Sequence, residues 1–189
     1  MARIVSLIII GCWIIFVGYW VISAFGQKAT SEKKGFLSTL TYRAPLTLGG
    51  LLLWYQRFHH PLNLTLTPHT DWVRTLGAVV CASGLLVTLW SRWTLGGNWS
   101  SEVAFKQGHE LVKTGPYRFV RHPIYTGLLL MCLGTAGAVG QLHSWLGFLI
   151  LGLGLWIKLK QEEALMLRHF PDTYPAYQKQ VKALIPFVI

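Results

Sequence analysis

The chain has 189 residues, of which 52% are hydrophobic and 13% are charged, and its mean hydropathy is +0.44. A soluble domain carries about 25% charged residues, so the composition excludes an ordinary soluble protein and favours an integral membrane protein. The formal net charge is +10. Because the basic residues lie beside apolar runs, we attribute this charge to membrane orientation and anionic lipid headgroups, and we expect no nucleic-acid partner.

Five apolar segments are predicted to cross the membrane. At about 1.5 Å per residue, about 20 helical residues cross an apolar core about 30 Å thick. The predicted spans are Ile4–Gly26, Phe36–Tyr55, Trp72–Trp93, Pro123–Gly140 and a fifth that begins with Trp145–Ile157. The fold class is therefore all-α: an integral membrane bundle of five transmembrane helices, with a C-terminal cytoplasmic helix region. We expect one domain over residues 1–189, with the N-terminal membrane spans in 1–93.

The last two spans are predicted to form a tight antiparallel hairpin. Only a short turn, Gln141–Ser144, separates them, and both contain small residues such as Gly127 and Gly147 that permit close helix contact. From Lys158 the chain stays helical but turns polar. Phe170-Pro171-Asp172 then ends that helix, and a short amphipathic segment follows.

The distribution of Lys and Arg predicts the orientation. Nearly all of these residues follow span one, follow span three or lie in the C-terminal tail, whereas one side keeps only Arg3, Arg57 and Arg74. Because cytoplasmic segments carry the excess of positive charge, we expect the N-terminus outside and the C-terminus inside. The polar connection after span three and the C-terminal helix then share the cytoplasmic face.

The densest polar cluster is residues 115–127, GPYRFVRHPIYTG. Proline is favoured at the first position of a helix, so Pro123 predicts a helix start with His122 at its N-cap. Free backbone N–H groups and the positive dipole end would then lie beside Arg121 and His122, which favours an anion site at the membrane boundary. A positively charged membrane flank is the simpler alternative, but it does not explain why His, Pro and Tyr adjoin the arginines.

The hairpin brings a second set of polar residues to this cluster. If spans four and five are antiparallel neighbours, then Arg121, His122 and Tyr125 face Glu162 and Glu163. Cations and helix N–H groups on one side, and carboxylates on the other, match a zwitterionic ligand that carries a carboxylate and ribose hydroxyls. The alternative is that Glu162 pairs with a lysine one turn earlier on a solvated helix face.

Other chemistries have little support in the sequence. The seven histidines lack metal-ligand spacing, so no metal site is expected. Cys12, Cys81 and Cys132 lie inside apolar runs and are interpreted as packing residues. Gly96-Gly97 lacks the pattern of a phosphate-binding loop.

The ordered motifs resemble those of a known family. GPY-x-x-x-RHP-x-Y-x-G, followed by EE, FP-x-x-Y-x-x-Y and a late IPF, is similar to the isoprenylcysteine carboxyl methyltransferase family over about Gly96 to Phe187. The resemblance implies a membrane-embedded methyltransferase that uses S-adenosylmethionine, releases S-adenosylhomocysteine and methylates the carboxylate of a prenylated C-terminal cysteine. It also implies that residues 94–189 form the cofactor-binding catalytic region.

The resemblance assigns roles to individual residues. The cofactor would contact residues of the cluster, of the segment before it and of the acidic pair: His109, Leu111, Val112, Gly115, Pro116, Tyr117, His122, Pro123, Tyr125, Glu162 and Glu163. Arg121 and Glu163 are candidate catalytic residues. Arg92, at the cytoplasmic end of span three, is a further candidate that would hold the acceptor carboxylate, because an arginine offers a bidentate fork.

Partners follow from the same resemblance. A lipid-tailed acceptor would enter sideways from the bilayer, among the membrane lipids, and no obligate protein partner is inferred. A carboxylate acceptor is already ionised at neutral pH and needs no base. Two enzymatic alternatives remain open, an N-methyltransferase of phospholipids or other lipid amines and an NADPH-dependent enzyme like the sterol reductases. A non-enzymatic scaffold is the remaining class.

Overall fold

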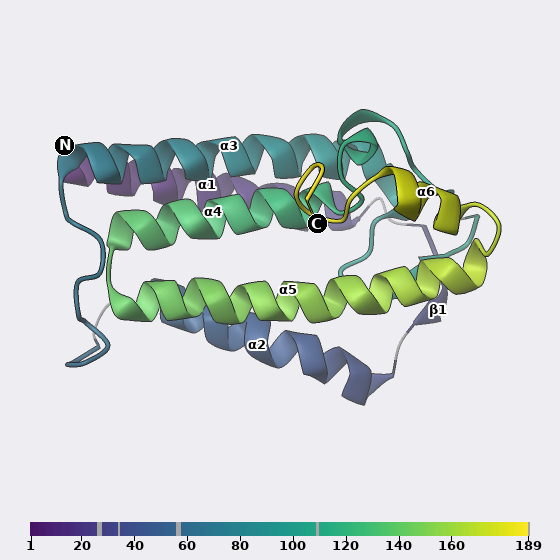
Figure 1. Cartoon of the computed structure of the whole chain (residues 1–189), viewed down its shortest axis with the longest axis horizontal. Helices are drawn as coiled ribbons and strands as arrows, with labels where there is room; N and C mark the ends of the chain where they lie inside the picture. Colours follow the sequence, from purple (N-terminus) through teal and green to yellow (C-terminus); the bar gives the residue numbers. More distant parts are fainter. Residues whose placement is uncertain (26–27, 34, 56–57, 109, 189) are drawn as a thin grey trace.

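A computed structural model describes residues 1–25, 28–33, 35–55, 58–108 and 110–188. Its long helices lie along one common axis, and the C-terminal part of the chain gathers at one end of them (Figure 1). In chain order the elements are α1 (Ala2–Ala24), β1 (Thr30–Lys33), α2 (Phe36–Trp54), α3 (Asp71–Leu95), the 3-10 turn η1 (Gly96–Asn98), β2 (Ala104–Lys106), the 3-10 turn η2 (Gly115–Arg118), α4 (Pro123–Val139), α5 (Leu142–His169) and α6 (Tyr174–Gln180).

The predicted spans match helices within a few residues at each end. The first was predicted to end at Gly26, which lies outside the described residues, and α2 continues through Pro45 without ending there. Within the described chain, α1, α3 and α5 are long and apolar enough to cross a membrane, and α4 is a shorter apolar helix. These helices make the chain an integral membrane protein.

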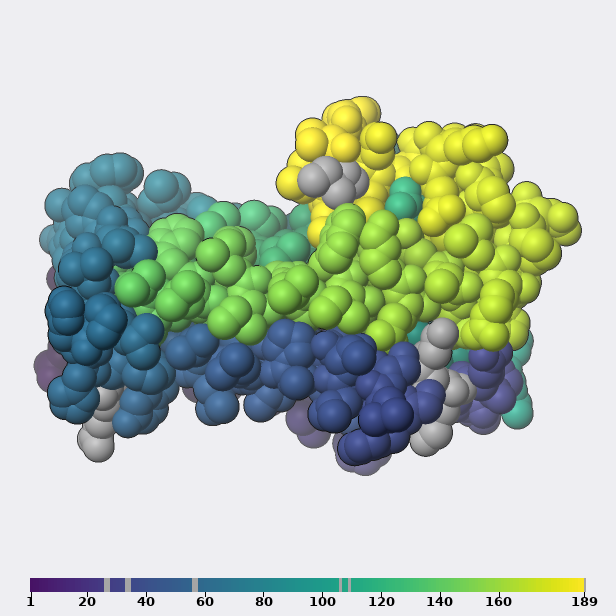
Figure 2. Space-filling model, turned by 60° about the horizontal axis from the view of Figure 1, so that its bottom comes forward, coloured from purple at the N-terminus to yellow at the C-terminus, as the bar shows by residue number. Residues whose placement is uncertain are grey.

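Glycines decide which helices pack most closely, and they do not pair α4 with α5 as predicted. A Cβ built on Gly127 of α4 would lie 2.6 Å from the carbonyl oxygen of Gly84 on α3, so the two backbones are in direct contact. A Cβ on Gly147 of α5 would lie 2.7 Å from the carbonyl oxygen of Gly49 on α2. The prediction of a glycine-tight α4–α5 hairpin is therefore wrong. The glycines bind α4 to α3 and α5 to α2, and Figure 2 shows α2 lying along α5.

Larger side chains fill the space between α4 and α5. Cys132 and Ala136 of α4 form one buried cluster with Leu151, Leu155 and Leu159 of α5. The two helices are therefore antiparallel neighbours held by ordinary hydrophobic packing. A polar contact joins α1 to this pair, because Trp13 Nε1 donates a hydrogen bond of 3.0 Å to Thr135 Oγ1.

A short antiparallel ribbon departs from the predicted all-α fold. Strand β1, which follows α1, pairs with β2, which follows α3. Glu32 of β1 also accepts hydrogen bonds from Arg168 (2.7 Å) and His169 (2.8 Å) at the end of α5. The ribbon therefore joins the segment after α1, the segment after α3 and the end of α5 to one another.

The C-terminal segment returns to the start of α4. The backbone N–H groups of Arg121 and His122 donate hydrogen bonds of 2.8 and 2.9 Å to the carbonyl oxygens of Lys182 and Ala183. Figure 2 shows α6 and this segment standing together over one half of the molecule. The residues around the start of α4 are thus enclosed by α5, α6 and the chain's end.

Candidate functional site

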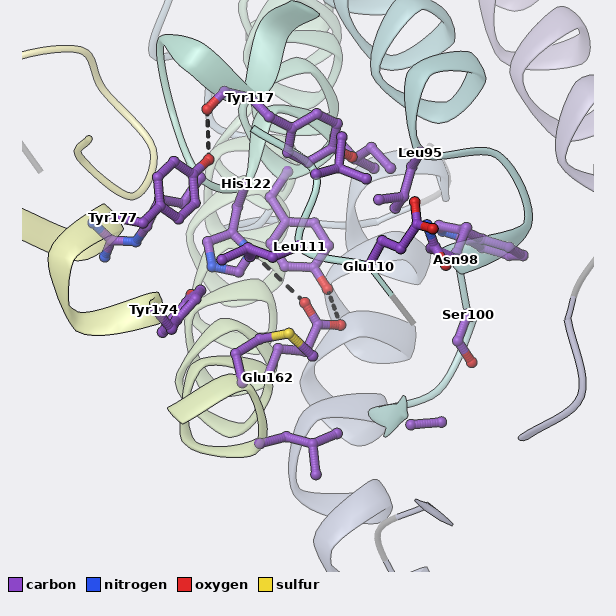
Figure 3. A pocket seen from close by; sticks show the side chains of 18 of the residues that line it. Leu95, Asn98, Ser100, Glu110, Leu111, Tyr117, His122, Glu162, Tyr174 and Tyr177 are labelled. Atoms are coloured by element: carbon purple, nitrogen blue, oxygen red, sulfur yellow. Dashed lines mark hydrogen bonds and ion pairs between the residues drawn. The ribbon is translucent and has the colours of Figure 1, made fainter. Parts of the chain in front are cut away.

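A cavity of about 130 Å³ lies at the end of the bundle where α4 begins. Its lining comes from the end of α3, the connection between α3 and α4, the start of α4, the polar half of α5, and α6. Figure 3 shows the lining side chains converging from these elements. Polar and aromatic groups from residues far apart in the chain therefore line one cavity.

The start of α4 has the geometry predicted from the sequence. Pro123 occupies the first turn, and His122 is the N-cap residue. The first-turn N–H groups are less free than predicted, however. Those of Tyr125 and Thr126 bond to the His122 carbonyl, and the N–H groups of Arg121 and His122 bond to the C-terminal segment. These four backbone N–H groups are therefore already bonded within the chain.

The two glutamates of α5 face Arg121 and His122, just before the start of α4, as predicted. Arg121 Nε and Nη2 donate hydrogen bonds of 2.8 and 2.5 Å to Glu163 Oε1. The His122 ring lies between both acids, with Nδ1 3.7 Å from Glu162 Oε2 and Nε2 3.4 Å from Glu163 Oε1. The Tyr125 hydroxyl donates a hydrogen bond of 2.6 Å to Glu162 Oε1. The site is thus one connected network of two carboxylates, a guanidinium, an imidazole and a phenol.

The two acids differ in exposure. The Glu163 side chain is 9% exposed and is held by Arg121, whereas the Glu162 side chain is 24% exposed and lines the cavity. The lysine pair considered in the sequence is also present, since Lys158 Nζ lies 3.8 Å from Glu162 Oε1. That ion pair therefore accompanies the Tyr125 and His122 contacts instead of replacing them. Glu162 is the acid placed to meet a ligand, and Glu163 is placed to hold Arg121.

Phenols form a second wall of the cavity. The Tyr177 hydroxyl of α6 donates a hydrogen bond of 2.5 Å to the Tyr117 carbonyl oxygen, which connects α6 to η2 (Figure 3). Burial raises the pKa of the Tyr177 phenol to about 12 and raises that of Tyr117 further. Both phenols are therefore neutral hydrogen-bond donors at physiological pH.

The remaining predicted residues lie in several places. Leu111 and Val112 line the cavity together with Tyr117, Arg121, His122, Tyr125 and Glu162. Gly115, Pro116, Pro123 and Glu163 are not among its lining residues; they shape the turn and helix start or hold Arg121. His109 lies outside the described residues.

Arg92 is buried at the end of α3, and it does not line the cavity. Its Nη1 and Nη2 donate hydrogen bonds of 2.7 Å each to the carbonyl oxygens of Gly96 and Ser23. The guanidinium also lies over the ring of Trp99, 4.6 Å from its centroid, and Trp99 lines the cavity. Arg92 Nε is buried without a hydrogen-bond partner among the described residues. In this structure the guanidinium connects α1 and α3 and supports one wall of the site.

Several cavity residues were not predicted as site residues. Tyr174 and Tyr177 belong to the FP-x-x-Y-x-x-Y motif, so their spacing was a signal that could have identified them. Trp99, Glu102 and Glu110 lie in the connection between α3 and α4, where no periodic pattern indicates which side chains turn inward. The β1–β2 ribbon and the Lys158 contact to the Ser101 carbonyl oxygen, at 2.9 Å, place that connection against α5.

The comparisons with known proteins define the class. The chain belongs to the phospholipid methyltransferase family, whose model matches residues 72–173. Within this class, curated relatives are protein-S-isoprenylcysteine O-methyltransferases. That of Schizosaccharomyces pombe is 38% identical over 99 residues, covering 49% of this chain and 41% of the relative. That of Xenopus laevis is 23% identical over 185 residues, covering 94% of this chain and 62% of the relative.

A solved structure gives the same result. The eukaryotic intramembrane Ras methyltransferase ICMT (isoprenylcysteine carboxyl methyltransferase) matches with a TM-score of 0.55 and 25% identity, over 78% of this chain and 53% of that chain. The resemblance to the isoprenylcysteine carboxyl methyltransferase family is confirmed. The chain spans about half the length of these relatives, from 41% to 62%.

The family implies a methyl donor, and the polar and aromatic groups of the cavity are the described residues that could hold one. The His122 ring lines the cavity between the two acids, and Glu162 retains an exposed fraction toward the cavity. A carboxylate accepts hydrogen bonds from paired hydroxyls or from an ammonium group. Aromatic side chains from three segments offer a surface to which a flat ring or a cationic group can bind.

Proposed function

We propose that the chain is an S-adenosylmethionine-dependent membrane methyltransferase that methylates the carboxylate of an isoprenylated cysteine or a similar lipid-tailed acceptor. The observation that carries this proposal is the cavity at the start of α4, where His122, Arg121 and Tyr125 meet the acidic pair of α5. All its lining residues fall between Leu95 and Tyr177. This supports the division of one domain, residues 1–189, into the N-terminal membrane spans (1–93) and a cofactor-binding catalytic region (94–189) that includes the last two spans.

The side chains act by binding and orientation. The Glu162 carboxylate, fixed by Tyr125, is placed to bind hydroxyl or ammonium groups, and His122 is placed to bind the carboxylate of the cofactor's amino-acid end. Arg121 keeps a positive charge at the cavity wall and holds Glu163. When bound, S-adenosylmethionine supplies an electrophilic methyl group. The carboxylate acceptor needs no base, so positioning in a water-excluding cavity is the protein's main contribution.

The acceptor and the membrane orientation belong to the same proposal. The acceptor's lipid tail enters from the bilayer, and the product S-adenosylhomocysteine leaves to the cytoplasm. We propose five spans, counting α2 and the shorter α4 with the three helices that meet the length and composition of a span. The positive charge near the cavity then gives an external N-terminus and a cytoplasmic C-terminus. We propose that Arg92 does not contact the acceptor carboxylate and instead acts on acceptor binding indirectly, by supporting the Trp99 ring that lines the cavity.

A second candidate function is methylation of a phospholipid amine. The family model that matches residues 72–173 is described as phospholipid methyltransferase, which favours it specifically. An amine acceptor must lose a proton before or during transfer. Glu102 and Glu110 line the cavity along with Glu162 and are the additional carboxylates that could accept it.

The deciding experiment measures methyl transfer from labelled S-adenosylmethionine in detergent. We expect transfer to an S-farnesylated cysteine derivative with a free carboxylate, and none to its methyl ester. Transfer to phosphatidylethanolamine alone would favour the second function. Binding of NADPH without binding of S-adenosylhomocysteine, measured by calorimetry, would refute both and favour a reductase.

A further inference from the structure

A second cavity, of about 240 Å³, lies at the opposite end of the bundle from the first. It is formed by the beginning of α1, the first turns of α3 and the end of α4, which lie near the N-terminus in Figure 1. Its walls include Val5 and Ile9 of α1, Thr135 and Val139 of α4, and Arg74 of α3. The cavity shares no lining residue with the first one, so the cofactor proposal does not explain it.

The cavity carries an uncompensated positive charge. Arg74 is half-buried, and within the described chain no carboxylate lies within ion-pair distance of its guanidinium. The described lining residues include no aspartate or glutamate. The other polar side chains of the described lining include Ser6, Thr135, Gln141 and His69, whose Nε2 lies 3.0 Å from the Val139 carbonyl oxygen, and none of them is a carboxylate. An anion is therefore the complementary ligand.

The apolar walls specify what carries that anion. Ile10 lines the cavity and is 43% exposed on α1, beside other exposed apolar residues of the same helix such as Ile4 and Ile14. Because these side chains suit contact with lipid, the cavity is continuous with the bilayer-facing surface of α1. A free inorganic anion would leave the apolar walls unused, whereas a phospholipid would contact both parts of the cavity.

We propose that this cavity binds an anionic phospholipid of the leaflet at the N-terminal end of α1. Arg74 holds the lipid phosphate, since the planar guanidinium donates two parallel hydrogen bonds to phosphate oxygens. Val5, Ile9 and Ile10 contact the upper part of an acyl chain. The lipid then bridges α1, α3 and α4 and helps to hold α1 against the bundle.

Native mass spectrometry of the full chain in detergent tests this proposal. With dioleoylphosphatidylglycerol as the probe, we expect a single-lipid adduct at lower lipid concentration than with dioleoylphosphatidylcholine. Arg74→Gln should weaken phosphatidylglycerol binding by about tenfold or more, because it removes a charged hydrogen-bonded partner. The affinity of Arg74→Lys for phosphatidylglycerol should lie between those of the unmodified chain and Arg74→Gln. The matched control is Arg3→Gln, which removes an exposed cation on the first turn of α1 that does not line the cavity.

A second variant examines the apolar part. Ser6→Leu adds volume at a lining position and should reduce adduct formation without changing charge. Glycerophosphoglycerol, the headgroup without acyl chains, should not displace the lipid at equal concentration. Equal adduct formation by Arg74→Gln and Arg3→Gln would overturn the proposal, as would equal affinity for the two lipids. Displacement by glycerophosphoglycerol would show that the site binds a soluble phosphate and would overturn the lipid assignment.

Discussion

The buried ion pair between Arg121 and Glu163 gives the sharpest test of how the candidate site is held. The two side chains are 10% and 9% exposed, and Arg121 also donates hydrogen bonds from Nη1 to the carbonyl oxygens of Gln178 and Val181. One guanidinium thus connects α4, α5 and the C-terminal segment. Removing its charged partner should affect folding stability as well as ligand binding.

The structure sets the magnitude of that effect. Breaking a fully buried pair costs about 3–5 kcal/mol, because the remaining charge is buried without compensation. In Glu163→Gln the amide oxygen can still accept one hydrogen bond, and the carbonyl oxygens of Gln178 and Val181 remain. We therefore expect a smaller loss than this range, about 2–3 kcal/mol in the free energy of unfolding.

A double-mutant cycle isolates the pair. The free energy of unfolding would be measured by SDS titration in mixed micelles for Glu163→Gln, Arg121→Gln and the double variant. We expect the double variant to be less destabilised than the sum of the single variants by about 1.5–3 kcal/mol. The control is Arg43→Gln: its ion pair with Glu102 has side chains 51% and 34% exposed, so the loss should be under about 1 kcal/mol. Additive single effects, or an equal loss in the control, would refute the reasoning.

Three further predictions concern the ligand, the packing and the orientation. Tyr125→Phe removes the hydrogen bond that fixes Glu162 and should weaken binding of S-adenosylhomocysteine, measured by calorimetry, by about fivefold while leaving the fold intact; unchanged affinity would show that this bond does not organise the site. Gly127→Ala should lower the thermal unfolding temperature in detergent, because its Cβ meets the α3 backbone, whereas Gly137→Ala, with nothing within 4 Å, should be neutral or slightly stabilising; equal effects would contradict the close-contact argument. A cysteine placed at Lys179 should react with an impermeant thiol reagent only after the membrane is opened, because the C-terminus is proposed to be cytoplasmic. The three native cysteines are buried and should contribute little background labelling. Labelling of intact cells would reverse the proposed orientation.

The parts of the site that were predictable from the sequence depend on local rules. Pro123 specifies a helix start, and the step from an apolar to a polar pattern at Lys158 marks where α5 leaves its apolar environment. An antiparallel arrangement of two consecutive helices then places the start of one beside the end of the other. Glu162 and Glu163 accordingly face His122, and this follows from chain order alone.

The parts that were not predictable depend on contacts between distant segments. Arg92 is a cation at the end of a span. Nothing in the local sequence shows that its Nη2 donates a hydrogen bond to the carbonyl oxygen of Ser23, 69 residues earlier. Trp99 and Glu110 enter the cavity from an aperiodic connection whose path is set by pairing with β1. Likewise, a glycine in a helix indicates that another helix can approach closely, but it does not indicate which helix that is.

Which helices the glycines bring together affects the cavity at the start of α4 directly. Because α4 is held against α3 and α5 against α2, the interface between α4 and α5 depends on side chains, and its composition changes along its length. Toward the middle it is filled by Leu151 and Leu155 with Cys132. Toward the start of α4, Tyr125 belongs to the same cluster, and its hydroxyl also donates a hydrogen bond to Glu162 Oε1 of α5 beside the cavity. Had glycines drawn α4 and α5 together, backbone contact would have closed this space. The cavity therefore lies where side chains, and not glycine contacts, form the interface between α4 and α5.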